Sequence, residues 1–118
     1  MSSTTVSPPM HESNLRSLQR IVHGAAPMPL ALLQRAMEAL PQVGFIGSYG
    51  MTETSAVVSL NGPFTWATRA PHAAVLASVG RAGFGCEVRI TGADGRPQPP
   101  GVVGEICVRG PGVMQGYW

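Results

Sequence analysis

Residues 18–47, LQRIVHGAAPMPLALLQRAMEALPQVGFIG, decide the fold class of the first part of the chain. A β-prone run at 18–23 and an apolar run at 43–47 flank a segment, 29–40, whose apolar residues recur with helical spacing. One face of that helix would carry Leu30, Leu33, Met37 and Leu40, with Gln34, Arg35 and Glu38 pointing away. Pro29 suits a first helical turn, and Pro41 ends the helix. The stretch therefore predicts a strand, a helix and a second strand.

Such a strand–helix–strand unit predicts two parallel strands joined by a right-handed crossover. Both strands then end at the same edge of the sheet. We therefore expect the loops that leave them, 24–27 and 48–55, to be neighbours in space. Ligands of open α/β sheets bind at that edge, so the topology by itself nominates these two loops as a site.

The second half of the chain has a different pattern. Residues 61–85 are rich in Gly, Pro and Ala with little periodicity, and we expect them to be irregular. The segments 86–91 and 103–109 predict an antiparallel pair of strands, with a turn at Asp94-Gly95. The expected fold class is α/β followed by β. The expected division is a disordered or loop segment at 1–13, an α/β nucleotide-binding segment at 14–60 and a β-rich segment at 61–118, changing character between 58 and 78.

Charged residues are scarce in this sequence. They make up 12% of the chain, against roughly 25% in an ordinary soluble domain, while the hydrophobic share of 44% is ordinary. This indicates either a surface covered by the rest of a larger protein or simply a sparse polar surface. The arginines never form a run, so nucleic acid is not an expected partner.

The cysteines and histidines do not form a recognisable site. Cys86 and Cys107 lie far apart without a CxxC pair, which predicts neither a disulfide framework nor a zinc site, and we expect apolar packing for both. His11, His23 and His72 are not spaced as metal ligands; surface loop positions are expected for His11 and His72, and a structural hydrogen bond for His23. No signal-peptide pattern and no membrane-length apolar stretch are present, so a cytoplasmic location without a membrane span is expected.

The segment Ser48-Tyr-Gly-Met-Thr-Glu-Thr-Ser55 has the chemistry of a nucleotide loop. The ring of Tyr49 could stack on adenine, and Gly50 lets the backbone approach a ligand closely. The hydroxyl of Thr52 could donate to a phosphate oxygen, and Glu53 offers a carboxylate for Mg²⁺. The alternative is a solvated loop whose Thr and Glu cap the next turn, but the position after a strand and the paired loop favour a nucleotide.

Four segments, spread over residues 15–118, resemble the AMP-dependent synthetase and ligase family of acyl-CoA synthetases, luciferases and peptide-synthetase adenylation domains. Residues 49–55 resemble its signature loop, and His23-Gly-Ala-Ala-Pro27 resembles its Gly-Gly-Ala-Pro element. Ser78-Val-Gly-Arg81 is similar to the segment that enters its β-barrel subdomain, and residues 101–117 are similar to its Gly-Glu-Leu…Gly…Gly-Tyr element. The resemblance implies a βαβ piece of a flavodoxin-like subdomain followed by part of a small β-barrel subdomain.

By this resemblance, Tyr49 would stack on adenine, Thr52 would contact the AMP phosphate and Glu53 would bind Mg²⁺, which makes Thr52 and Glu53 the expected catalytic residues. The expected cofactor-binding positions also include Gly24, Ala25, Ala26, Ser48, Gly50 and Met51. The implied reaction joins a carboxylic acid to the α-phosphate of ATP and releases pyrophosphate; a thiol, most often that of coenzyme A, then displaces AMP. A carboxylic acid and coenzyme A are therefore the implied partners of the intact enzyme.

Three parts of that family's site have no match here. These are the phosphate loop with its lysine, the ribose-binding aspartate and the lysine of the C-terminal domain; the chain has no lysine, and its one aspartate, Asp94, falls in the expected turn. We therefore expect an internal fragment of such a ligase, from a truncated or split reading frame, that is inactive alone. The alternatives are a non-catalytic remnant that at most binds nucleotide or a complementing chain, and a gene-assembly artefact. The identity of the acid and of the thiol stays open.

Overall fold

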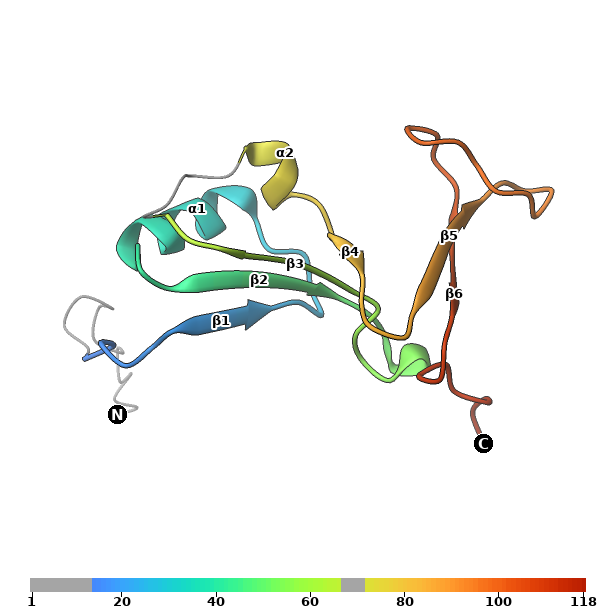
Figure 1. Cartoon of the computed structure of the whole chain (residues 1–118), viewed down its shortest axis with the longest axis horizontal. Coiled ribbons are helices and arrows are strands. Elements are labelled where there is room, and N and C mark those ends of the chain that lie inside the picture. Colours follow the sequence, from blue (N-terminus) through green and yellow to red (C-terminus); the bar gives the residue numbers. More distant parts are fainter. Residues whose placement is uncertain (1–13, 67–71) are drawn as a thin grey trace, which may run out of the picture.

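The computed structural model describes residues 14–66 and 72–118 and contains two β-sheets (Figure 1). In the first sheet four strands lie in the order β1 (Arg20–His23), β2 (Gly44–Tyr49), β3 (Ser59–Phe64) and β4 (Arg81–Ala82). The second sheet pairs β5 (Glu87–Thr91) with β6 (Glu105–Arg109). The helical elements are α1 (Leu30–Ala39), α2 (Ala73–Leu76) and the short 3-10 turn η2 (Thr52–Thr54). The expectations for residues 1–13, His11 included, lie outside the described residues.

The predicted strand–helix–strand unit is present as β1, α1 and β2. β1 and β2 run parallel, with Val22 opposite Ile46. Pro29 stands immediately before α1 as its N-cap residue, one position before the first turn in which it was expected. β2 is longer than expected, because Ser48 and Tyr49 pair with β3 instead of starting the loop.

The hydrophobic core lies between α1 and the first sheet. Its buried side chains are Leu33, Met37, Val43, Phe45 and Leu76. Leu30 at the start of α1 and Leu40, the residue directly after α1, also pack against it, in agreement with the helical spacing predicted for that face. In Figure 1, α1 and α2 lie on the same side of the sheet.

The prediction that residues 61–85 are irregular is wrong in part. β3 runs antiparallel along β2 and continues to Phe64, α2 follows, and β4 pairs with β3. The sequence of β3, SLNGPF, hides the strand, because Gly and Pro have low strand propensity and the extended backbone is favoured by pairing with β2 and β4. The first sheet thus contains strands from both sides of position 60. We propose that the α/β segment extends to Ala82; the division of the chain into domains stays a prediction.

β5 and β6 form the predicted antiparallel pair. Directly paired residues share a face, so Val88 and Val108 lie on the apolar face, whereas Cys107 lies opposite Arg89 on the charged face. Cys107 is exposed, and its Sγ is 3.3 Å from Oγ1 of Thr91. The predicted apolar packing of Cys107 is therefore wrong, while Cys86 is half-buried. Within the described ranges, these two strands do not close into a barrel.

Candidate functional site

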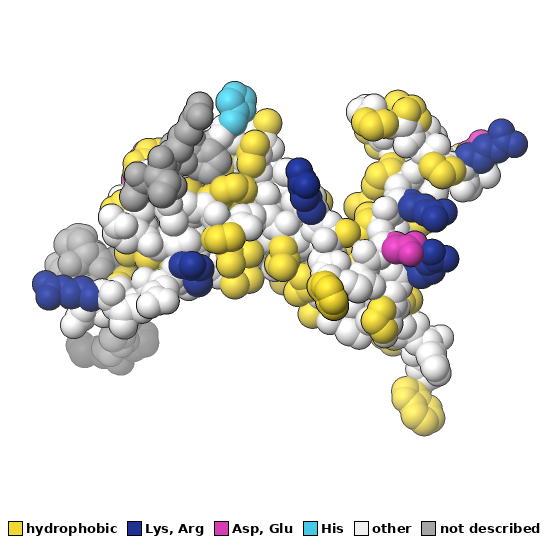
Figure 2. All heavy atoms as spheres, in the orientation of Figure 1, with side chains coloured by type: hydrophobic (Ala, Val, Ile, Leu, Met, Phe, Trp, Pro, Cys, Tyr) yellow, Lys and Arg dark blue, Asp and Glu magenta, His cyan; other side chains and the backbone are white. Residues whose placement is uncertain are grey.

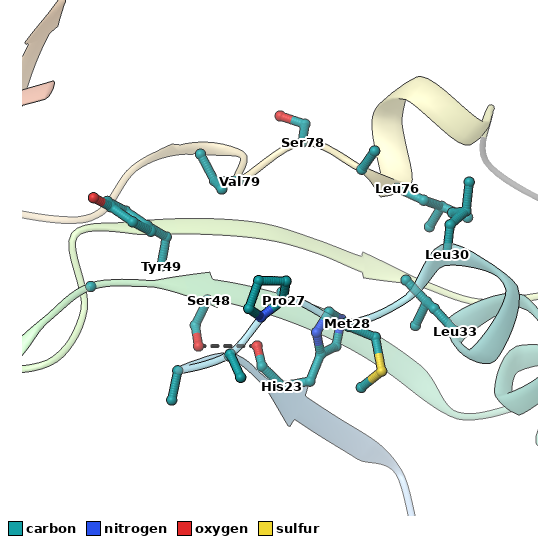
Figure 3. Close-up of a pocket in the computed structure, with 16 residues that line it drawn as sticks. His23, Pro27, Met28, Leu30, Leu33, Ser48, Tyr49, Leu76, Ser78 and Val79 are labelled. Carbon is teal, nitrogen blue, oxygen red and sulfur yellow. Dashed lines mark hydrogen bonds between the residues drawn. The ribbon is translucent and has the colours of Figure 1, made fainter. Parts of the chain in front are cut away.

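A groove of about 530 Å³ opens at the carboxyl ends of β1 and β2 (Figure 3). Its walls are the loop after β1, the end of β2 and the connector 76–79, which runs from the last residue of α2 toward β4; Leu30 and Leu33 of α1 also line it. The volume falls in the range of about 300–1,000 Å³ that is usual for small-molecule sites. Oγ of Ser48 donates a hydrogen bond over 3.1 Å to the carbonyl oxygen of His23, the residue before the first loop, and Gly24 of that loop packs against Ser48. The expectation that these loops are neighbours is confirmed.

The structure divides the predicted site residues into two groups. Six of them line the groove: Gly24, Ala25, Ala26, Ser48, Tyr49 and Gly50. Met51, Thr52 and Glu53 are not part of its lining. Thr52 and Glu53 belong to η2, directly after the groove-lining end of β2.

The backbone that links these two groups is tightly folded. A Cβ atom on Gly50 would stand 1.3 Å from the carbonyl oxygen of Ala56, so only glycine fits where the chain turns back on itself. Ser55 and Ala56 have φ angles of 53° and 87°, and Ala25 in the other loop has a φ of 65°. Non-glycine residues in this left-handed region cost on the order of 1–3 kcal/mol and concentrate at functional sites. The strained positions therefore support a site in these two loops.

The connector 76–79 forms a third wall that the sequence analysis missed. Nδ2 of Asn61 donates to the carbonyl oxygens of Val75 and Ser78, each over 2.7 Å. Oγ of Ser59 donates to the carbonyl oxygen of Val79 over 2.7 Å. The sequence does carry a signal for this wall, because Ser59 and Asn61 are polar residues two positions apart, and such residues share one face of a strand. β3 thus fixes the position of this wall.

The groove is mostly apolar. Of the described residues that line it, none is Asp, Glu, Lys or Arg. The labelled side chains of Tyr49 and Val79 lie at one end of the groove, and those of Leu30 and Leu33 at the other (Figure 3). Such a lining suits the flat, uncharged part of a ligand and, among the described residues, offers no Lys or Arg to a phosphate chain.

Glu53 lies on η2, where the last residues of the chain contact it. Oη of Tyr117 donates to Oε1 of Glu53 over 2.8 Å, and the N–H of Met114 donates to the carbonyl oxygen of Glu53 over 2.8 Å. The residue's own backbone hydrogen bond and then the Tyr117 hydroxyl hold the pKa of Glu53 below its ordinary value of 4.5. The hydrogen bond to Glu53 raises the pKa of Tyr117 above its ordinary value of 10.0. The lowered pKa favours an ionised Glu53 at neutral pH, and the raised pKa keeps Tyr117 protonated as its hydrogen-bond donor.

An ionised Glu53 fits Mg²⁺ as one ligand among several. Mg²⁺ is usually held by one or two carboxylates, water and substrate phosphates. The described part of the chain has no cluster of three His, Cys, Asp or Glu residues that could hold a metal ion. The donor set therefore suits a metal that arrives with its nucleotide.

Comparison with protein families shows to which family the chain belongs. The model of the AMP-binding enzyme family matches residues 3–118. The chain belongs to this family.

Known AMP-binding enzymes resemble this family member along most of its length. It is 38% identical over 111 residues to a feruloyl-CoA synthase of Amycolatopsis sp, a match that covers 94% of the chain and 21% of that relative. It superposes on the amide bond synthetase McbA of Marinactinospora thermotolerans with a TM-score of 0.79 and 35% identity, over 94% of the chain and 21% of that structure. The O-succinylbenzoate coenzyme A synthetase of Bacillus subtilis, solved with ATP and magnesium ion, matches with a TM-score of 0.67 and 35% identity, over 86% and 19%.

The chain spans about a fifth of the length of the curated relatives it matches. The family and the fold class predicted from the sequence are confirmed for this AMP-binding enzyme chain. The individual roles of the site residues stay predictions.

Proposed function

We propose that the chain forms the nucleotide- and acyl-facing part of an ATP-dependent carboxylic acid–thiol ligase, which makes an acyl adenylate and then a thioester with coenzyme A. The observation that carries the proposal is the groove at the sheet edge, built from both loops that the sequence nominated. The relatives include enzymes named as CoA ligases, such as a feruloyl-CoA synthase and a 2-succinylbenzoate–CoA ligase. These names support an acid and coenzyme A as substrates.

In this proposal, each group of residues has one task. Adenine lies in the groove against the ring of Tyr49, and the small residues Gly24, Ala25 and Ala26 leave room for nucleotide and acyl group. Thr52 donates to the AMP phosphate and Glu53 holds Mg²⁺, which when bound neutralises charge on the phosphates. The chain's own contribution is to hold the two anions, carboxylate and nucleotide, in reacting position.

Two further points concern location. No helix in the described residues is long and apolar enough to cross a membrane. We keep the expected cytoplasmic location as part of the proposal, because Cys86 and Cys107 are both free thiols, as is usual in a reducing compartment.

A chimera tests the proposed catalytic roles. Residues 14–118 would replace the matching segment of the Amycolatopsis feruloyl-CoA synthase, and acid-dependent exchange between ATP and pyrophosphate would be measured. Thr52→Ala and Glu53→Ala should each slow exchange on the order of a hundredfold or more, because each removes charge stabilisation that acts in the transition state. Glu38→Ala, on the exposed side of α1, is the matched control and should leave the rate unchanged. Wild-type exchange in both site variants would refute the assignment.

A second candidate function is nucleotide binding without catalysis, either alone or with a complementing chain. The uncharged lining of the groove favours it, because such a lining can hold adenine but does not grip a triphosphate. Calorimetry of the chain with MgATP tests whether the chain binds nucleotide or is inert. Saturable heat that Tyr49→Ala removes would support binding, and no heat at millimolar nucleotide would exclude it.

A further inference from the structure

Residues 112–117 pack on the turn that carries Glu53. Oγ of Ser55 donates to the carbonyl oxygen of Gly112 over 2.7 Å, and the N–H of Met114 donates to the carbonyl oxygen of Glu53 over 2.8 Å. A Cβ atom on Gly112 would lie 3.0 Å from the carbonyl oxygen of Thr54, so the two backbones approach closely. The main chain on which Glu53 sits is therefore held by a segment far away in sequence.

The same segment also reaches the carboxylate itself. Oη of Tyr117 donates to Oε1 of Glu53 over 2.8 Å. In the described part of the chain, no other side chain hydrogen-bonds to this carboxylate. An exposed glutamate would otherwise sample several rotamers, whereas one oxygen held by a phenol fixes the direction in which the second oxygen points.

We propose that Tyr117 is a positioning residue for the metal-binding carboxylate of Glu53. This inference rests on the proposed function, because it takes Glu53 to be the Mg²⁺ ligand. Mg²⁺ demands near-ideal octahedral geometry, so the orientation of a ligating carboxylate matters to its affinity. Hydrogen-bonded partners of metal ligands commonly contribute about 10–100-fold to metal affinity. Tyr117 on Oε1 leaves Oε2 for the metal.

An arrangement in which Tyr117 blocks the metal predicts an effect of the opposite sign on metal affinity. If the Tyr117 hydroxyl occupied the oxygen that the metal needs, the two would compete, and removing the hydroxyl would strengthen metal binding. The sign of the effect therefore decides between a positioning residue and a competitor.

The experiment uses the full 118-residue chain and needs no turnover. NMR titration gives the affinity for MgATP and, in EDTA, the affinity for metal-free ATP. The first affinity divided by the second reports the metal contact, because the nucleotide contacts cancel. Tyr117→Phe keeps the ring and removes only the hydroxyl. We expect it to lower the ratio about tenfold and to leave the affinity for metal-free ATP unchanged. Glu53→Gln should bring the ratio close to one.

The controls separate failure of this inference from failure of the proposed function. Trp118→Phe changes the neighbouring exposed aromatic residue and should leave both affinities as they are. If the ratio exceeds one in the wild type and Tyr117→Phe leaves it unchanged or increases it, only the proposed role of Tyr117 is overturned. A wild-type ratio of one would overturn the role of Glu53 as well, and with it the positioning role.

Discussion

The hydrogen bond between Tyr117 and Glu53 makes both side chains sensitive to pH. The pKa of Glu53 is lowered, so the contact contributes stability above pH 4.5 and loses it as the pH falls through the lowered value. The pKa of Tyr117 is raised, mainly by Glu53, so its contribution is complete below pH 10.0 and is lost as the pH rises through the raised value. Between these limits the carboxylate is ionised and the phenol is protonated, which is the state in which Tyr117 donates its hydrogen bond to Glu53.

This contact predicts a titration that can be followed directly. The chain has two tyrosines, so in a Tyr49→Phe background the ultraviolet absorbance of phenolate reports Tyr117 alone. We expect a midpoint above 10.0, because ionising the phenol breaks its hydrogen bond to a negative carboxylate. Adding Glu53→Gln should lower the midpoint toward the ordinary value. A midpoint that does not respond to Glu53→Gln would show that the two side chains are not in contact in solution.

Among the secondary-structure elements, β3 has a role beyond pairing with β2. Two of its polar side chains, Ser59 and Asn61, hold the connector 76–79 that forms one wall of the groove. Each hydrogen bond contributes about 0.5–1.5 kcal/mol net. The wall therefore depends on β3 for its position.

Asn61→Leu tests this dependence. It removes both donors, so the free energy of unfolding should fall by about 1–3 kcal/mol, and the affinity of the folded chain for adenosine should fall because one wall of the groove is released. Chemical denaturation and an NMR titration with adenosine measure the two effects.

Val43→Ala is the control, because Val43 is buried in the core and is not part of the groove lining. It should reduce stability but not the affinity of the folded chain. Equal affinities in Asn61→Leu and wild type would contradict a positioning role for β3.

Local sequence patterns explain what could be predicted from the sequence, and non-local contacts explain what could not. The β1–α1–β2 unit follows from helical spacing and two prolines, and its topology then puts 24–27 beside the end of β2. The third wall and the contact of Tyr117 with Glu53 depend on partners 14 to 64 positions away. No local pattern specifies such pairs, and the Gly62-Pro63 step conceals the strand that creates one of them.

The molecule as a whole leaves much apolar surface open. Among the described residues six hydrophobic side chains are buried, whereas sixteen large ones are exposed, including Val22, Phe84 and Val103. Figure 2 shows such side chains at the surface over both parts of the molecule, with charged ones scattered between them. The radius of gyration is 17.9 Å, compared with about 13–14 Å for a compact domain of this length. This surface agrees with the low charge content and supports a chain that packs against further protein.

We expect the chain alone to have no ligase activity. Its groove lacks Lys and Arg among the described residues and the sequence lacks lysine, so little is available to neutralise a triphosphate during adenylation. Exchange of pyrophosphate into ATP should equal the protein-free blank with ferulate, 2-succinylbenzoate or indoleacetate. Robust turnover by the pure chain would refute this expectation.

The close approach of Gly50 to Ala56 has a consequence for the history of the chain. Any side chain at position 50 would collide with the main chain, whether or not a nucleotide ever binds. Selection for folding alone therefore retains this glycine, whereas the role proposed for Thr52 in contacting the AMP phosphate is retained only by selection for chemistry. In a lineage that had abandoned catalysis, Thr52 would drift while Gly50 stayed fixed, so the rates of substitution at these two nearby positions distinguish a working ligase segment from a relic.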